Sequence, residues 1–382
     1  MQIPVVDKDG NPLMPTKPSR ARRWLKDGKA VKRWSDVGLF YVQLTVDPSA
    51  TEVQDVVVGI DPGKLYSGIG VQSAKATLFM AHLVLPFETV KKRMEQRSTM
   101  RRTRRGRRIN RDVAFKFRNH RQKRFDNRSG SKLPPSIRAN RQMELRVVKE
   151  LATLFPLSQI VWEYVSADVD LTSGRKGARS GKGFSPVMVG QRWAIEQLSR
   201  IAPVIKAMGW ETANLRRYLG LQKTKDKAKQ TPQSHAVDGV ALAASGFLAY
   251  EPFHDGAVRG KRWVGTAILS ECLFKVIRRP PICRRQLHLF QPAKCGVRRA
   301  YGGTVTRHGF RKGDLVRAEM AGRFYLGWVS GDTARQVSVS DCDWKRLGQF
   351  AASKVQLIKR SINLLVSGAS NPLSPASYPS PT

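Results

Sequence analysis

Four side chains in this 382-residue sequence have the types and spacing that could build a hydrolytic metal site. Asp61 ends the apolar run VVVGID, just before a Pro-Gly pair, and Glu163 lies inside the apolar run QIVWEYV. His235 and Asp238 stand three apart in QSHAVDG, so a helix would place both on one face. Mg²⁺ and Mn²⁺ prefer oxygen ligands, and converging carboxylates can hold the two ions used in phosphodiester hydrolysis.

Each of these residues also has a simpler explanation. An acid after a strand caps a turn more often than it binds a metal, and a histidine near a helix start is common. Glu163 differs because a charged carboxylate is costly to bury without a metal or a cation beside it. The combination of the four therefore favours a metal site more than any one residue does.

The surrounding pattern predicts an α/β unit that positions these residues. Apolar runs at 55–61, 66–72 and 77–85 predict an antiparallel meander, and 159–165 predicts a further buried strand. Residues 187–208 are expected to form a helix, GWETANL a short strand, and the small, apolar stretch after QSHAVDG a helix lying flat on the sheet.

Charge points to a polyanionic partner. The chain has 68 Lys and Arg against 29 Asp and Glu, a formal net charge of +39. Residues 91–128 hold 17 of the basic residues and three acids, which predicts a long basic helix contacting nucleic acid. The alternative is a solvated or disordered basic arm, although Phe115, Phe117 and Phe125 offer something to pack.

The remaining segments carry weaker signals. Residues 1–50 look like a small nucleic-acid-contacting appendage, the chain after about 305 like a small β-barrel, and the last residues like a disordered tail. The four cysteines lack zinc-site spacing, so reduced, packed thiols are expected. No apolar run is long enough for a membrane span and no signal peptide is recognised, so we expect no membrane partner and a cytoplasmic location.

Several motifs resemble one known family. GNPLMPTKPSRARRWLKDGKA, GIDPG, the basic stretch 91–128, VWEYV, SHAVDG, RRQLH and GVRRAYGGT resemble segments of the transposon-encoded IscB/IsrB family, relatives and presumed ancestors of RNA-guided CRISPR nucleases. IscB proteins carry an HNH nuclease between the second and third RuvC motifs, whereas this chain has no histidine between Glu163 and His235. The sequence thus resembles the HNH-lacking IsrB branch.

The resemblance implies an α/β fold with an RNase H-like (RuvC) core, whose first and fourth strands are neighbours. The implied organisation is a PLMP domain (1–52), RuvC part I (53–90), an arginine-rich bridge helix (91–128), RuvC parts II and III (129–250), a C-terminal β-barrel-like domain binding RNA and the adjacent motif (251–362) and a disordered tail (363–382).

The implied activity is that of a Mg²⁺-dependent endodeoxyribonuclease that nicks the non-target strand. Asp61, Glu163 and Asp238 would hold two Mg²⁺ or Mn²⁺ ions, and His235 would assist metal binding or proton handling. The implied partners are one guide (omega) RNA per chain and target double-stranded DNA with an adjacent motif. The arginines expected to contact nucleic acid are Arg20, Arg22, Arg23, Arg101, Arg102, Arg104, Arg105, Arg107, Arg108, Arg111, Arg118, Arg121, Arg284, Arg285, Arg298 and Arg299.

Three alternatives remain open from the sequence. The chain could be a guide-binding protein whose nuclease has decayed, or a RuvC-type resolvase or transposition protein that acts without RNA. A plain basic RNA-binding protein would explain the charge but not the ordered acids.

Overall fold

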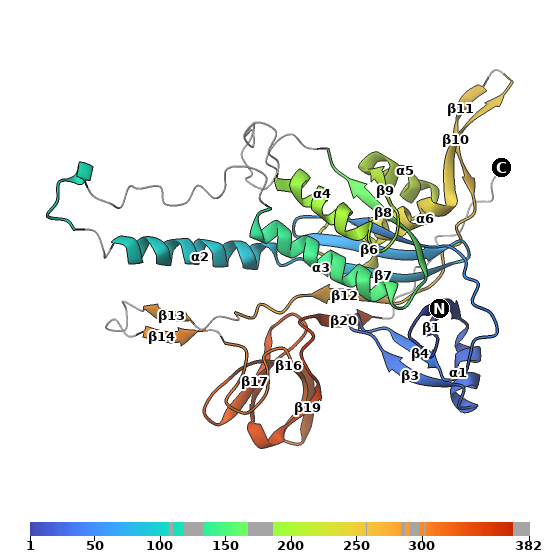
Figure 1. Cartoon of the computed structure of the whole chain (residues 1–382). Helices are drawn as coiled ribbons and strands as arrows, with labels where there is room; N and C mark the ends of the chain where they lie inside the picture. The colour runs from blue at the N-terminus through green and yellow to red at the C-terminus, as the bar shows by residue number, and fades with distance from the viewer. Residues whose placement is uncertain are drawn as a thin grey trace. The chain divides into compact units, whose positions relative to one another are not determined.

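The computed structural model describes residues 1–106, 110–117, 133–166, 186–256, 258–283, 287–290, 298–301 and 303–369 (Figure 1). These form two compact units. One contains Met1–Arg33 and Phe40–Phe274, and the other contains Trp34–Leu39 and Lys275–Ala369.

Up to residue 265 the elements follow one another along the chain. In order they are β1 (Ile3–Val6), β2 (Pro12–Thr16), α1 (Pro18–Lys26), β3 (Ala30–Trp34), β4 (Phe40–Leu44), β5 (Val56–Asp61), β6 (Tyr66–Ser73), β7 (Ala76–Val84), α2 (Phe87–Gly106), η1 (Phe115–Phe117), α3 (Pro135–Ala152), β8 (Leu157–Tyr164), α4 (Pro186–Leu198), β9 (Val204–Met208), α5 (Gly209–Tyr218), η3 (Pro232–Ala236), α6 (Val237–Ala244), η4 (Ser245–Phe247), β10 (Leu248–Asp255) and β11 (Val258–Gly265).

The C-terminal part is built mainly from strands. These are β12 (Phe274–Arg278), β13 (Leu287–Phe290), β14 (Arg298–Tyr301), β15 (Leu315–Met320), β16 (Arg323–Asp332), β17 (Gln336–Ser340), β18 (Arg346–Ala351), β19 (Val355–Lys359) and β20 (Leu365–Ala369), with the short η6 (Ala352–Lys354) between the last pairs.

The central sheet confirms the predicted meander and its extension. Five of its strands lie in the order β7-β6-β5-β8-β9. β6 is antiparallel to β5 and β7, whereas β8 runs parallel to β5 and β9 parallel to β8. The fold is therefore mixed α/β, and its first strand, β5, pairs with its fourth, β8, as the RNase H-like expectation requires. This pairing directs the carboxyl ends of the strands bearing Asp61 and Glu163 to the same edge.

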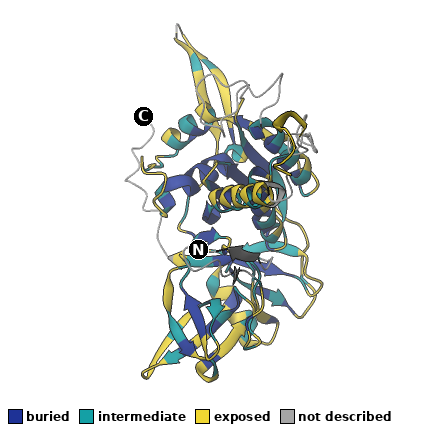
Figure 2. Ribbon diagram, turned by 90° about the vertical axis from the view of Figure 1, so that its left-hand side faces the viewer, coloured by how far each residue is buried: buried dark blue, intermediate teal, exposed yellow. Residues whose placement is uncertain are grey.

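Helix α6 lies flat on β5 and β6 because the contact surface is made of small residues. A Cβ on Gly70 would lie 2.4 Å from the backbone nitrogen of Val240, so no larger residue fits there. Leu242 and Ala243 of the same helix pack with Val57 of β5 in a fully buried cluster. Figure 2 shows this central layer as the most continuously buried part of its unit.

Three local predictions were wrong in this unit. The helix expected over 91–128 is α2, which begins at Phe87 and ends at Gly106. Residues 110–114 do not continue it; there the Asn110 side chain accepts a hydrogen bond from the Asp112 nitrogen (3.0 Å) in a turn. Residues 118–128 lie outside the described residues.

The segment GWETANL is helix α5 and not a strand. Glu211 in its first turn accepts a hydrogen bond from the Met208 nitrogen at 2.5 Å, which caps the helix. The strand lies just before this segment, as β9. Pro203 cannot continue a helix, so the chain after α4 becomes extended there. Residues 187–208 accordingly form a helix and a strand, not one helix.

A smaller sheet forms the N-terminal part. Its strands lie in the order β2-β1-β4-β3, with β4 parallel to β1. Ala21 of α1 packs against it with Val5 and Val42. Among the described helices, none combines the length and the apolar character needed to cross a membrane.

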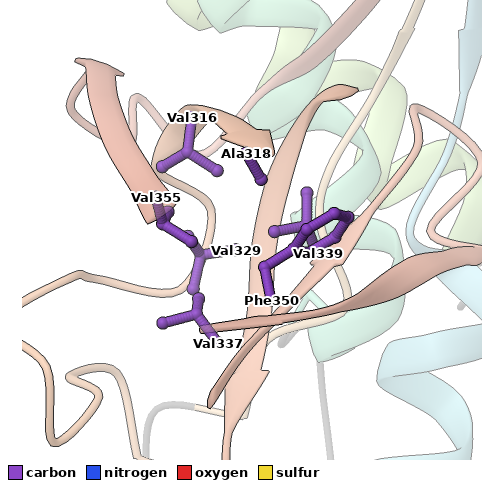
Figure 3. Packing of buried hydrophobic residues seen from close by; sticks show 7 residues of the cluster. All are labelled: Val316, Ala318, Val329, Val337, Val339, Phe350 and Val355. Atoms are coloured by element: carbon purple, nitrogen blue, oxygen red, sulfur yellow. The ribbon is translucent and has the colours of Figure 1, made fainter. Parts of the chain in front are cut away.

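The second unit contains an antiparallel sheet of five strands in the order β18-β17-β16-β15-β19. Figure 3 shows the side chains of seven residues gathered between these strands, namely Val316, Ala318, Val329, Val337, Val339, Phe350 and Val355. This agrees with a small β-rich domain after about residue 305. The tail predicted to be disordered from 363 begins instead with strand β20, and residues from 370 lie outside the described part.

Candidate active site

Asp61, His235 and Asp238 converge although they are far apart in the sequence. One ligand atom from each lies within 4.8 Å of the others, and all three residues are buried. Asp61 is the last residue of β5, His235 lies in the η3 turn, and Asp238 is in the first turn of α6. Helix α6 is thus fixed by its packing on β5 and β6 with its first turn at the Asp61 end of the sheet.

The irregular backbone of η3 sets the direction of His235. Ser234, inside η3, has non-helical angles of φ −84° and ψ −111°, which kink the chain one residue before His235. Its hydroxyl donates to the Thr231 carbonyl (2.6 Å) and pairs with His82 Nδ1 (2.8 Å). The His235 ring in turn stacks on Tyr66, with ring centroids 5.9 Å apart. These contacts hold the imidazole against the sheet.

His235 presents one nitrogen to Asp61 and leaves the other open. Its Nδ1 lies 2.8 Å from Asp61 Oδ2. An ionised carboxylate can only accept, so Nδ1 carries the proton in the neutral ring and Nε2 keeps its lone pair. Nε2 is buried and has no hydrogen-bond partner among the residues that the structure describes.

Glu163 lies near this group but is not one of the three residues within 4.8 Å. Its Oε2 accepts a hydrogen bond from the Thr212 hydroxyl at 2.7 Å, which connects β8 to α5. Burial raises the pKa of the Glu163 carboxyl, and the negative charges of Asp61 and Asp238 raise it further. Glu163 therefore interacts electrostatically with both other acids, as a shared cation site would require.

Asp238 is held by two cationic side chains that sequence reasoning missed. Arg216 Nη1 of α5 lies 2.5 Å from Asp238 Oδ1, and Lys223 Nζ contacts Oδ2. The Asp238 side chain is only 2% exposed, so these cations balance a charge that water cannot solvate. Nothing in the basic loop KTKDKAKQ distinguishes Lys223 from its neighbours in the sequence.

The loop after Asp61 is secured from α3. Arg141 Nη2 donates to the Gly63 carbonyl (2.9 Å), and Asn140 Nδ2 donates to the Lys64 carbonyl (2.8 Å). A Cβ on Gly63 would lie 1.8 Å from the Tyr66 carbonyl oxygen, so the tight turn requires glycine. Helix α3 consequently determines where the chain leaves the site.

Arg141 is itself fixed by a buried ion pair. Its Nη1 lies 2.7 Å from Glu144 Oε2, with side chains 9% and 1% exposed. Desolvation raises the pKa of Glu144, while the adjacent Arg141 charge opposes that rise. An i, i+3 Arg–Glu pair is ordinary on a helix surface, so only its burial marks it as part of the site's support.

The donor set fits a divalent cation. Asp61 and Asp238 offer carboxylate oxygens, Glu163 lies within electrostatic range, and His235 Nε2, buried without a partner in the described part of the chain, offers a nitrogen lone pair. A buried lone pair without a donor is costly unless something binds it. Oxygen-rich sites of this kind suit Mg²⁺ or Mn²⁺ better than zinc.

The structure places the predicted nucleic-acid-binding arginines unevenly. Arg20, Arg22 and Arg23 on α1, Arg101 and Arg102 on α2, and Arg111 are exposed. Arg104 and Arg105 belong to α2, and Arg298 and Arg299 to β14, without described side chains. Arg107, Arg108, Arg118, Arg121, Arg284 and Arg285 lie outside the described residues. The contacts of all sixteen with nucleic acid stay predictions.

Within the described part of the chain, Cys272 and Cys342 form no disulfide, in agreement with the expected thiols, and Cys295 lies outside the described residues. Cys272 is buried, and Cys283 and Cys342 are partly exposed. Burial raises the pKa of the Cys272 thiol to about 12, so it stays protonated at neutral pH.

The comparisons with known proteins include a solved structure and a family model. T. thermophilus RuvC in complex with Holliday junction substrate is similar to this chain at 14% identity, with a TM-score of 0.26, and covers 50% of this chain and 90% of that one. No curated protein matches the sequence. A family model described as RRXRR protein matches residues 3–183, a span that includes the RARR sequence of α1, strand β5 with Asp61 and strand β8 with Glu163. In this first half, the chain is similar to the RRXRR proteins.

Proposed function

We propose that this protein is a metal-dependent DNA endonuclease of the RuvC type that nicks one strand under the direction of a guide RNA. The observation that carries the proposal is the convergence of Asp61, His235 and Asp238 within 4.8 Å at the end of the buried strand β5. Glu163, the fourth residue of the predicted set, lies on the neighbouring strand, and burial, together with the charges of Asp61 and Asp238, raises its pKa.

In this proposal Asp61, Glu163 and Asp238 hold one or two Mg²⁺ or Mn²⁺ ions, with His235 beside them. When bound, such ions polarise the phosphodiester and lower the pKa of water. The protein supplies rigid carboxylates, which is the task of the buried strands β5 and β8 and of α6. His235, with its proton on Nδ1 directed to Asp61, offers Nε2 to accept a proton from the attacking water.

Nicking, as opposed to cutting both strands, follows from the number of such sites. The described residues contain one cluster of this kind, and the interval between Glu163 and His235 has no histidine to serve an HNH nuclease. A single site that acts once on one strand would leave a nick.

Guide RNA is supported by charge and by the family resemblance. A net charge of +39 exceeds what solubility needs, and Lys91, Lys92, Arg101 and Arg102 of α2 are exposed. Helix α2 and the arginines of α1 would hold RNA phosphates, and base pairing would select the target.

The experiment is to purify the full-length chain with its flanking locus and to sequence the RNA that co-purifies. A discrete RNA is expected, and the complex with Mg²⁺ should nick only plasmids that carry a sequence complementary to that RNA. Cleavage of a four-way DNA junction without RNA, and no RNA-dependent nicking, would overturn guidance in favour of a structure-specific resolvase.

A further inference from the structure

The two faces of the β10–β11 hairpin have different chemistry. The hairpin is antiparallel over eight residue pairs, from Leu248 with Gly265 to Asp255 with Val258. Directly paired residues share a face, and successive residues alternate between faces. Figures 1 and 2 show the hairpin extending from the central unit, with most of its residues exposed.

One face, here called the aromatic-basic face, combines rings and cations without a carboxylate. Its pairs beyond the base are Tyr250 with Trp263, Pro252 with Lys261, and His254 with Arg259. The rings of Tyr250 and Trp263 lie 4.7 Å apart, and Lys261 Nζ lies 5.8 Å from the Tyr250 ring centroid. These contacts agree with the pairing and place the side chains on the same side.

The opposite face holds both acids of the hairpin. Its pairs include Glu251 with Arg262, Phe253 with Gly260, and Asp255 with Val258. Arg262 lies 5.7 Å from the Phe253 ring, and Phe253 covers Gly260, where a Cβ would lie 2.8 Å from the ring. Arg262 and Phe253 on this face thus contact one another, and the net charge of the face is negative.

The aromatic-basic face is connected to the active site through α5. Trp263 and Leu248 anchor the hairpin base in a core cluster with Leu215 of α5 and Ala241 of α6. The Trp263 ring also lies 6.1 Å from Tyr218, the last residue of α5. Two residues earlier, Arg216 contacts Asp238.

We propose that the aromatic-basic face of β10–β11 binds unpaired DNA, as a support that leads the strand to be cut toward Asp61 and Asp238. Aromatic rings stack on bases only where the bases are unpaired, and cations beside them hold the backbone. A face with two cations and no carboxylate attracts phosphate, whereas the opposite face repels it. The inference rests on the proposed nuclease function for the identity of the strand, but not for the binding itself.

The first test compares matched variants of the full-length protein, freed of nucleic acid in high salt and kept in EDTA. Arg259→Ala/Lys261→Ala should weaken binding of a fluorescein-labelled single-stranded oligonucleotide severalfold and reduce the slope of log affinity against log salt by about 1.4. Tyr250→Ala should weaken it roughly tenfold. Arg262→Ala, on the opposite face of the same hairpin, should bind as the unaltered protein does.

The second test locates the DNA directly. An oligonucleotide containing 5-iodouracil is irradiated with the protein, and the adducts are mapped by mass spectrometry. Adducts are expected at Tyr250 and not at Phe253, and competing duplex DNA should not remove them at equal concentration.

In the first test, equal affinity of the Arg259→Ala/Lys261→Ala and Arg262→Ala variants for the oligonucleotide would overturn the proposal. In the second test, it would be overturned by adducts that are absent from the hairpin or equally frequent at Phe253. Equal competition by duplex DNA or by single-stranded RNA would also overturn it. Because both tests are done without metal, they are independent of cleavage. If the unaltered protein nicks DNA but the hairpin neither cross-links nor affects oligonucleotide binding, only this surface is rejected. If the hairpin cross-links but the unaltered protein does not nick DNA, only the nuclease function is rejected.

Discussion

Both oxygens of Asp238 contact cationic side chains, those of Arg216 and Lys223. A divalent cation at this carboxylate must share it with them or displace them. Lys223 is the more replaceable of the two because it reaches the site from a loop, whereas Arg216 belongs to α5. The two ion pairs of Asp238 thus link the stability of the protein to metal binding.

The first prediction concerns Lys223→Ala. In EDTA the variant should melt at a lower temperature than the unaltered protein, because a buried carboxylate loses a partner. Adding Mg²⁺ or Mn²⁺ should raise the melting temperature of the variant more than that of the unaltered protein. Thermal melts with and without metal measure both effects. Lys225→Ala, an exposed lysine two residues further on, is the control and should change neither. An equal metal-induced shift in Lys223→Ala and the unaltered protein would refute competition at Asp238.

The ion pair of Arg141 and Glu144 gives a second prediction, on stability. Arg141→Ala leaves Glu144 buried and unpaired and releases the Gly63 carbonyl, so the free energy of unfolding should fall by about 3–5 kcal/mol. Urea denaturation measures it. The double variant Arg141→Met/Glu144→Leu should recover much of the loss, since no charge is then left unpaired. A single variant as stable as the original would show that the pair does not support the turn.

At the scale of elements, the close packing of α6 on β5 and β6 determines where His235 and Asp238 lie. The close approach of α6 to the sheet depends on glycines, and on Gly70 in particular, where an added Cβ would lie 2.4 Å from the backbone nitrogen of Val240. Backbone cannot move aside as a flexible side chain can. A change on the sheet face, remote from the acids, should therefore displace His235 and Asp238 together.

The third prediction is that Gly70→Ala lowers the free energy of unfolding by about 1–3 kcal/mol or more and impairs nicking by the folded fraction. Chemical denaturation and plasmid nicking, corrected for folded protein, measure the two effects. Gly331→Ala on β16 is the control, because a Cβ there has nothing within 4 Å. Full nicking by Gly70→Ala would mean that α6 tolerates a shift without moving the site.

The sequence predicted the elements whose pattern is local. The apolar runs gave β5, β6, β7 and β8 within a residue or two, and the three-residue spacing placed His235 and Asp238 together. The end of α2 could not be predicted from its basic composition, because Gly106 and the Asn110 turn end the helix there. The helical conformation of GWETANL was missed because it depends on the cap formed by Glu211. Tertiary context routinely overrides such patterns.

The supporting residues of the site could not be predicted. Arg141, Thr212 and Lys223 act through contacts made across long sequence separations, and their types are common on any basic protein surface. Glu163 was recognised because a buried acid requires a partner, but the hydroxyl that it contacts was not. Only the fold shows which of many arginines and lysines faces an acid.

At the scale of the whole molecule, the excess of basic residues predicts that nucleic acid binds mainly through the release of counterions from its phosphates. The fourth prediction is a steep, linear fall of log affinity for nucleic acid with log salt concentration. If six to ten phosphates are contacted, affinity should drop by roughly 10³–10⁵ between 50 and 200 mM salt. Fluorescence anisotropy with the full-length chain measures this, and a flat dependence would contradict the polyanion account.

The fifth prediction tests the site itself, through plasmid nicking by the protein–RNA complex in Mg²⁺. Asp61→Ala removes the carboxylate at the end of β5 and should abolish nicking while leaving RNA binding and folding intact. Asp55→Ala, which removes an exposed acid just before the same strand, should nick like the unaltered protein. Undiminished nicking by Asp61→Ala would show that the cluster of Asp61, His235 and Asp238 is not the nuclease site.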